Sequence, residues 1–102
     1  MDPRTFEIAY DLDSMEREEL SDELLVITAE ECAETIVACS KIIRFGLDEK
    51  NRENLITELG DVQCMINLMI EHEVVSKEEI TDQVEIKKNK LKKYARSSRM
   101  IN

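Results

Sequence analysis

The chain has 102 residues, enough for one domain with a small hydrophobic core. Its net charge of −9 argues against a surface that coats nucleic acid, and its two glycines and one proline favour an all-helical protein. The sequence contains no apolar run of about 18 residues and no signal-peptide pattern at Met1–Arg4. We therefore expect a soluble cytoplasmic protein that contacts neither membranes nor nucleic acid.

The three cysteines, Cys32, Cys39 and Cys64, lack CxxC spacing, and His72 is the single histidine. This pattern predicts reduced core cysteines rather than a zinc site.

Charge is distributed unevenly along the chain. Residues 1–86 hold all 23 acids and seven bases, whereas residues 87–102 hold seven bases and no acid. Basic side chains near a helix C-terminus suit the macrodipole and the solvent, but they can also bind phosphate groups. Both interpretations of the basic end remain open.

In chain order, residues 1–20 are expected to form a tail or a short helix opened by Asp2 and Pro3. A long helix is predicted to begin near Ser21, a suitable N-cap, and to end at Phe45-Gly46. A core stripe with spacing 4-3-4-3-4 is predicted along this helix at Leu25, Ala29, Cys32, Ile36, Cys39 and Ile43.

A polar loop is predicted at 47–52, where Asp48 or Asn51 can cap a second helix that runs to about Glu73. Its apolar stripe comprises Leu55, Leu59, Val62, Ile66 and Met69. A third helix is predicted from Ser76, where Ser76-Lys77-Glu78-Glu79 fits a capping box, and it carries Ile80, Val84, Ile86 and Leu91.

These elements predict an all-α helical bundle of about three main helices, with the domain at 21–96 and a C-terminal tail at 97–102. Each long helix has two apolar seams, more than so small a monomer would cover. We therefore expect a four-helix core completed by oligomerisation, in a homodimer or homotetramer.

Two clusters of acids stand out in the long helices. Glu30, Glu31 and Glu34 lie in EECAE, and Glu58 and Asp61 lie in ELGD. The acid-x-x-acid spacing places two carboxylates on one helix face, where like charges repel each other. On each helix the acids continue a second seam, which runs through Ile27, Glu31, Glu34, Ala38, Lys41 and Phe45, and through Asn54, Glu58, Asp61, Met65, Leu68 and His72.

Because these acids have apolar neighbours along their seams, we expect them to face a bundle interior or cleft rather than bulk solvent. Carboxylates without a histidine partner favour Mg²⁺ or Mn²⁺ over zinc, and Mg²⁺ commonly bridges to phosphate oxygens. The alternative is an ordinary acidic surface, since acid-x-x-acid is common in acidic helical proteins. Gly60 is unfavourable within a helix, and close approach of a helix or ligand would explain it as well as chance does.

EECAE and ELGD, separated by the 23 residues between Glu34 and Glu58, resemble the EExxE and ExxD motifs of the MazG-like, all-α nucleoside triphosphate pyrophosphohydrolases. SKIIRFG at 40–46 and ENLITELGDV at 53–62 are similar to the short stand-alone members, which are often phage-encoded. The resemblance covers roughly residues 20–95. Because such members are often phage-encoded, the expected cytoplasm could be that of a phage-infected cell.

The resemblance implies Mg²⁺-dependent cleavage of a nucleoside triphosphate into a monophosphate and pyrophosphate. It implies metal binding by Glu31, Glu34, Glu58 and Asp61. Glu30 would support this site, or would position or deprotonate the attacking water, and Glu30 and Glu31 are the catalytic candidates. The basic stretch EIKKNKLKKY at 85–94 resembles a substrate-contacting helix of the family. The resulting phosphate-binding candidates are Lys41, Arg44, Lys87, Asn89, Lys90 and Lys93.

Two other functions remain open. One is phosphoribosyl-ATP pyrophosphohydrolase, which shares the fold, and the other is a non-catalytic helical interaction module. The base and sugar of the substrate are not readable from the residues, and phage-type relatives favour a purine deoxynucleotide such as dGTP or dATP.

Overall fold

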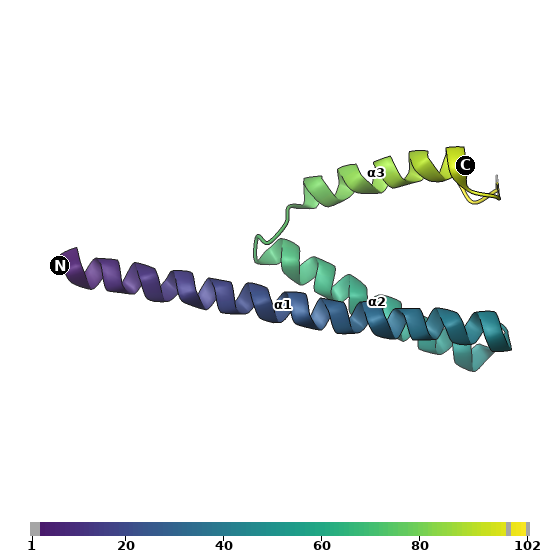
Figure 1. The fold of residues 1–102 in the computed structure, drawn as a ribbon, viewed down its shortest axis with the longest axis horizontal. Coiled ribbons are helices and arrows are strands. Elements are labelled where there is room, and N and C mark those ends of the chain that lie inside the picture. Colours follow the sequence, from purple (N-terminus) through teal and green to yellow (C-terminus); the bar gives the residue numbers. More distant parts are fainter. Residues whose placement is uncertain (1–2, 98, 102) are drawn as a thin grey trace.

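The structure, a computed structural model, describes the backbone of residues 3–97 and 99–101 and the side chains from Met15 onward within those ranges. Three helices account for almost all of it: α1 (Pro3–Phe45), α2 (Glu49–Glu71) and α3 (Lys77–Tyr94) (Figure 1). No strand occurs in the described residues. The predicted all-α class is therefore confirmed. No helix in the described part of the chain is both long and apolar enough to cross a bilayer.

The first helix is longer than the sequence pattern predicted. It begins at Pro3 and passes through Ser21 without interruption, so Ser21 is not an N-cap. Residues 16–20, Glu-Arg-Glu-Glu-Leu, are strong helix formers, and no glycine or proline follows to end the helix. Proline suits the first turn, as predicted, whereas Asp2 lies outside the described residues.

A short turn joins α1 to α2. Gly46 takes the left-handed conformation, with φ of 98°, and donates its N–H to the Ile42 carbonyl at 2.8 Å. Asp48 is the N-cap of α2, since its Oδ1 accepts the Asn51 N–H at 2.8 Å. Asn51 instead bonds through Nδ2 to the Gly46 carbonyl at 3.0 Å. The loop is therefore shorter than the predicted 47–52, because α2 already starts at Glu49.

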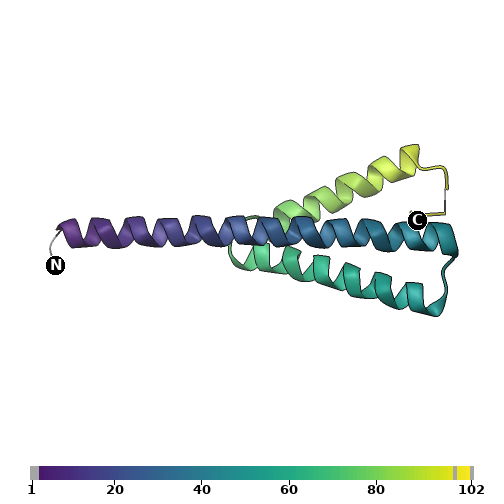
Figure 2. The ribbon, with the colours of Figure 1, turned by 60° about the horizontal axis from the view of Figure 1, so that its bottom comes forward.

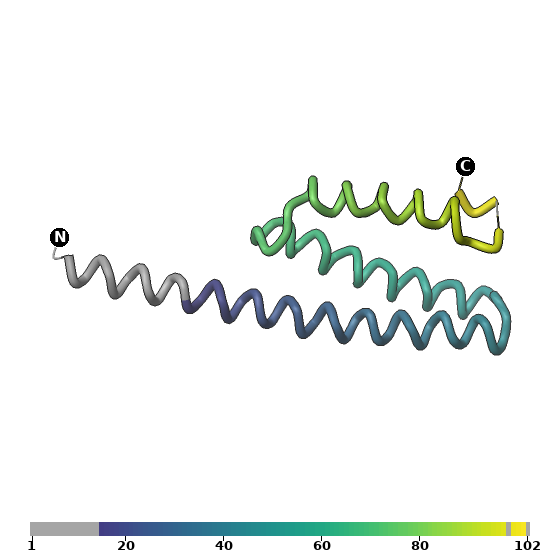
Figure 3. Tube along the Cα trace, turned by 45° about the horizontal axis from the view of Figure 1, so that its top comes forward, coloured from purple at the N-terminus to yellow at the C-terminus, as the bar shows by residue number. Residues whose placement is uncertain are grey.

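The second turn reverses the chain again. α2 ends at Glu71, two residues before the predicted Glu73, which has a left-handed φ of 61°. The capping box predicted at Ser76 is present: Ser76 Oγ accepts the Glu79 N–H at 3.1 Å, and Glu79 Oε1 accepts the Ser76 N–H at 3.0 Å. The three helices thus follow a zigzag path (Figure 3).

α1 and α2 form the packed pair of the fold, and α3 packs only sparsely on the rest (Figure 2). The buried side chains among those described are Leu24, Ala38 and Met65, which lie where α1 faces α2. At this interface Thr28 Oγ1 lies 4.0 Å from Met69 Sδ.

The predicted core stripe of α1 is wrong for the single chain. Leu25, Ile36 and Ile43 are 52%, 69% and 85% exposed. The three cysteines are free, but they are also exposed and not in a core. The reason is that α2 packs on the other seam of α1, which carries Ala38 and the acids. On α2, Leu59 is likewise exposed, whereas the other four members of its stripe are half-buried.

Candidate metal centre

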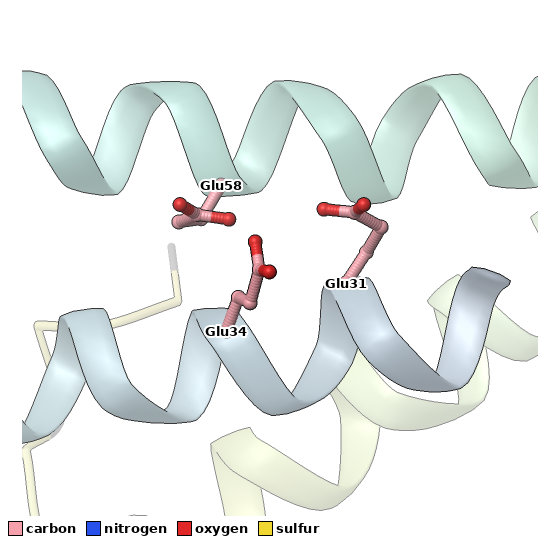
Figure 4. Close-up of side chains that lie close together, drawn as sticks. All are labelled: Glu31, Glu34 and Glu58. Carbon is pink, nitrogen blue, oxygen red and sulfur yellow. The ribbon is translucent and has the colours of Figure 1, made fainter.

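Three carboxylates from two helices meet between α1 and α2. Glu31 and Glu34 extend from α1 and Glu58 from α2, and all three point into the space between the helices (Figure 4). One oxygen from each carboxylate lies within 4.8 Å of the corresponding oxygens of the other two. The structure therefore joins residues from both acidic motifs into one cluster.

The helical repeat explains this position. Glu31 and Glu34 are three residues apart and share the α1 face that packs on α2. Leu24 and Ala38 lie seven residues before and after Glu31, so buried contacts flank the acids on both sides. As a result Glu31 and Glu58 are half-buried, while Glu34 remains exposed.

Two oxygens of the cluster have no hydrogen-bond partner. Oε2 of Glu31 and Oε2 of Glu58 are both inaccessible to solvent and unpaired. A buried carboxylate oxygen without a donor is unfavourable, because it has lost water and gained no replacement. Protonation relieves this situation, since a protonated carboxyl can donate to a neighbouring acid.

The pKa values of Glu31 and Glu58 are both raised. The pKa of Glu31 is raised above its ordinary value, first by burial and then by the charges of Glu34 and Asp61. The pKa of Glu58 is raised first by a hydrogen bond with Glu34 and then by burial and neighbouring carboxylates. For both groups the causes are burial and neighbouring carboxyl groups.

The donor set fits a hard divalent cation. It consists of carboxylate oxygens, the ligands that Mg²⁺ and Mn²⁺ prefer. Two oxygens bound to one Mg²⁺ are at most about 4.2 Å apart, and the carboxylate oxygens of the cluster lie within 4.8 Å of one another. The unpaired oxygens of Glu31 and Glu58 are the natural first ligands. Asp61 is exposed and close enough to Glu31 to act on its pKa through a hydrogen bond, so it can complete the set.

The other predicted site residues lie around or away from this cluster. Glu30 is exposed, and its charge contributes to the raised pKa of Glu31. Lys41 and Arg44 are also exposed, and the Arg44 guanidinium lies 5.0 Å from the centre of the Phe45 ring.

The candidates on α3, namely Lys87, Asn89, Lys90 and Lys93, are exposed on a helix that packs sparsely on the rest of the chain. Lys93 Nζ lies 5.4 Å from the centre of the neighbouring Tyr94 ring. Nothing in the geometry of one chain holds these four residues against the carboxylates.

The structure changes the interpretation of Leu24 and Gly60. Leu24 is one of the three buried side chains but was not in either predicted seam, although its position seven residues before Glu31 was a usable signal. Gly60 has an ordinary helical environment, and a Cβ added there would meet nothing within 4 Å. Close approach within one chain therefore does not explain this glycine.

Comparison with protein-family models, curated proteins and solved structures found no significant match to the chain. The resemblance to the MazG-like enzymes therefore stays a prediction from the sequence motifs.

Proposed function

We propose that this chain is a Mg²⁺-dependent nucleotide pyrophosphohydrolase that converts a nucleoside or deoxynucleoside triphosphate into the monophosphate and pyrophosphate. The observation that carries the proposal is the meeting of Glu31, Glu34 and Glu58 from two separate motifs. Two of these acids have a raised pKa and an unpaired buried oxygen, which is the state expected of a cation site before the cation binds.

In this proposal Glu31, Glu34, Glu58 and Asp61 would hold Mg²⁺, with Mn²⁺ as a substitute. The ion would supply positive charge for phosphate oxygens and make water a stronger nucleophile. Glu30 would position or deprotonate the attacking water, because its carboxylate is exposed beside the cluster.

The substrate would be recognised mainly through its phosphates. Lys41 and Arg44 continue from the acids along α1 toward its C-terminus, where positive side chains are also favoured by the macrodipole. The basic side chains of α3 are further candidates for phosphate contacts. For the nucleoside we favour a purine deoxynucleotide, a preference that comes from the family resemblance alone.

The decisive experiment measures pyrophosphate release from the common nucleoside and deoxynucleoside triphosphates with Mg²⁺. Phosphoribosyl-ATP belongs in the same panel, because its hydrolysis would identify the related enzyme of that substrate class. Glu34→Gln and Asp61→Asn should reduce pyrophosphate release at least 100-fold while retaining the helical circular dichroism of the wild type. Glu53→Gln, a matched change on the exposed face of α2, should leave the rate unchanged.

The proposal fails if Glu34→Gln and Asp61→Asn both retain full activity, since the cluster would then not be the metal site. If the folded wild type releases pyrophosphate from no substrate in the panel, the non-catalytic interaction module becomes the better description.

A further inference from the structure

An uncharged surface runs along α1 on the side that α2 leaves open. We call it the α1 stripe, and its six residues are Leu25, Ala29, Cys32, Ile36, Cys39 and Ile43. All six are exposed in the single chain. The stripe spans 18 residue steps, which corresponds to about 27 Å of helix.

The positions beside the stripe are uncharged as well. They are Val26, Ala33 and Ser40 on one side and Thr28, Thr35 and Ile42 on the other. The charged residues between Leu25 and Ile43 are Glu30, Glu31, Glu34 and Lys41, and all of them lie off the stripe and its flanks. An exposed helix face of this length without a single charge is typical of a helix-packing interface.

The exposed area of the chain shows how much surface is left to cover. It amounts to 8714 Å², whereas a compact monomer of 11.9 kDa exposes about 6,000 Å². The excess of roughly 2,700 Å² is well above the ~800 Å² that each partner buries in a standard interface. The radius of gyration of 19.5 Å likewise exceeds the ~13 Å expected of a compact chain of this length.

We infer that the α1 stripe is the interface with a second copy of this chain, and that the two α1 helices pair in antiparallel orientation. The stripe is symmetric about residue 34, so antiparallel pairing places Leu25 opposite Ile43, Ala29 opposite Cys39 and Cys32 opposite Ile36. Two large side chains pair at each end of the stripe, and each inner pair contains at least one small side chain: Ala29 opposite Cys39, and Cys32 opposite Ile36.

Charge favours this orientation over the parallel one. The part of α1 just before the stripe is acidic, since residues 16–23 hold five acids (Glu16, Glu18, Glu19, Asp22 and Glu23) and one base, Arg17. Parallel pairing would place two such segments side by side, where like charges repel. Antiparallel pairing instead places each segment at the turn that follows Phe45, the end of α1, in the second copy. Residues 44–52 around this turn carry three bases and two acids, so they do not repel an acidic segment.

The basic end of α3 reinforces this complementarity. α3 runs back along α2, and its carboxyl end lies toward the turn between α1 and α2 in both views of the ribbon (Figures 1 and 2). Residues 16–23 of one copy would therefore lie at the same end of the assembly as Lys92 and Lys93, in the last turn of α3, of the other copy. The pairing does not depend on the proposed chemistry, because none of the clustered carboxylates belongs to the stripe.

Light scattering on the full chain tests the interface. The wild type should have at least twice the 11.9 kDa mass of one chain. Ile36→Lys should lower the mass to that of one chain and reduce helical circular dichroism, because a charge would stand at the centre of the stripe. Val37→Lys, one residue along and also more than half exposed in the single chain, should retain the wild-type mass. A wild type with the mass of one chain, or an Ile36→Lys variant with the wild-type mass, would overturn the inference.

Disulfide trapping tests the orientation. In a background with Cys32→Ala and Cys64→Ala, Cys39 of each copy would be about 15 Å along the axis from its counterpart in antiparallel pairing. This exceeds the 4.4–6.8 Å between Cα atoms that a disulfide requires, so no covalent dimer should form under mild oxidation. Adding Ala29→Cys should produce a covalent dimer in high yield, because residue 29 then faces Cys39. Efficient cross-linking through Cys39 alone would instead show parallel pairing and refute the orientation.

Discussion

Glu34 on α1 and Glu58 on α2 face each other across the helix pair, and a hydrogen bond between their carboxyl groups is the largest cause of the raised pKa of Glu58. Such a bond requires a proton, because two ionised carboxylates are both acceptors. The pair therefore has two ways to avoid repulsion: it can retain a proton or bind a cation. These two solutions compete, and several predictions depend on that competition.

The stability of the metal-free protein should fall as the pH rises through the folded-state pKa values of Glu31 and Glu58. Both values lie above the ordinary 4.5, so the folded state binds more protons than the unfolded state in that interval. The stabilisation from these groups is complete below pH 4.5 and is lost on going to neutral pH. Urea unfolding in EDTA from pH 4.5 to 8 should show a smaller fall for Glu58→Gln than for the wild type. An equal fall in both proteins would contradict the assigned cause.

Divalent cations should restore the stability that the metal-free protein loses at neutral pH. At ten times its dissociation constant, Mg²⁺ should raise the unfolding midpoint by roughly 6–11 °C for a domain of this size. The increase should be smaller at pH 5, where protons compete for the carboxylates. Glu34→Gln should abolish the shift, whereas Glu53→Gln should preserve it. Differential scanning fluorimetry measures both, and an unchanged response in Glu34→Gln would exclude this cluster as the binding site.

Lys41 should contribute to substrate binding and not to metal binding. It follows the acids along the same seam of α1 and is exposed. Lys41→Ala should raise KM for a triphosphate about tenfold through loss of one charge-assisted phosphate contact, while the Mg²⁺-induced thermal shift stays at the wild-type value. Lys50→Ala in the first turn of α2 serves as the control and should change neither quantity. A loss of the thermal shift in Lys41→Ala would indicate a structural role instead.

The two glycines should respond to alanine in opposite directions. Gly60 lies within α2 with open space around it, so Gly60→Ala should stabilise the protein by about 1 kcal/mol. Gly46 has a φ of 98°, so Gly46→Ala should destabilise it by roughly 1–2 kcal/mol despite equally open space. Chemical denaturation measures both effects. A destabilising Gly60→Ala would show that a second copy or a ligand approaches α2 at this position.

Much of this fold follows from local sequence signals. Gly46 ends α1, Asp48 caps α2, and the Ser76–Glu79 capping box opens α3. These signals can be recognised in the sequence because each one involves residues only a few positions apart. Helical spacing also indicated that the acids of each motif share a face with apolar residues. The extension of α1 back to Pro3 was missed, because Ser21 suits an N-cap as well as a helix interior that has strong formers on both sides.

Which seam of α1 packs on α2 was a question that only the tertiary structure could decide. Both seams have the same spacing, and the one at Leu25–Ile43 is the more apolar, so periodicity alone favoured the wrong one. In the structure the seam of Glu31, Glu34 and Ala38 faces α2 instead, which brings Glu58 to the acids of α1. The sequence by itself determined the helices and the faces that their side chains share. Contacts between helices arise from residues far apart in the chain, and they determined that the two acidic motifs form one cluster and that the most apolar face of α1 remains open.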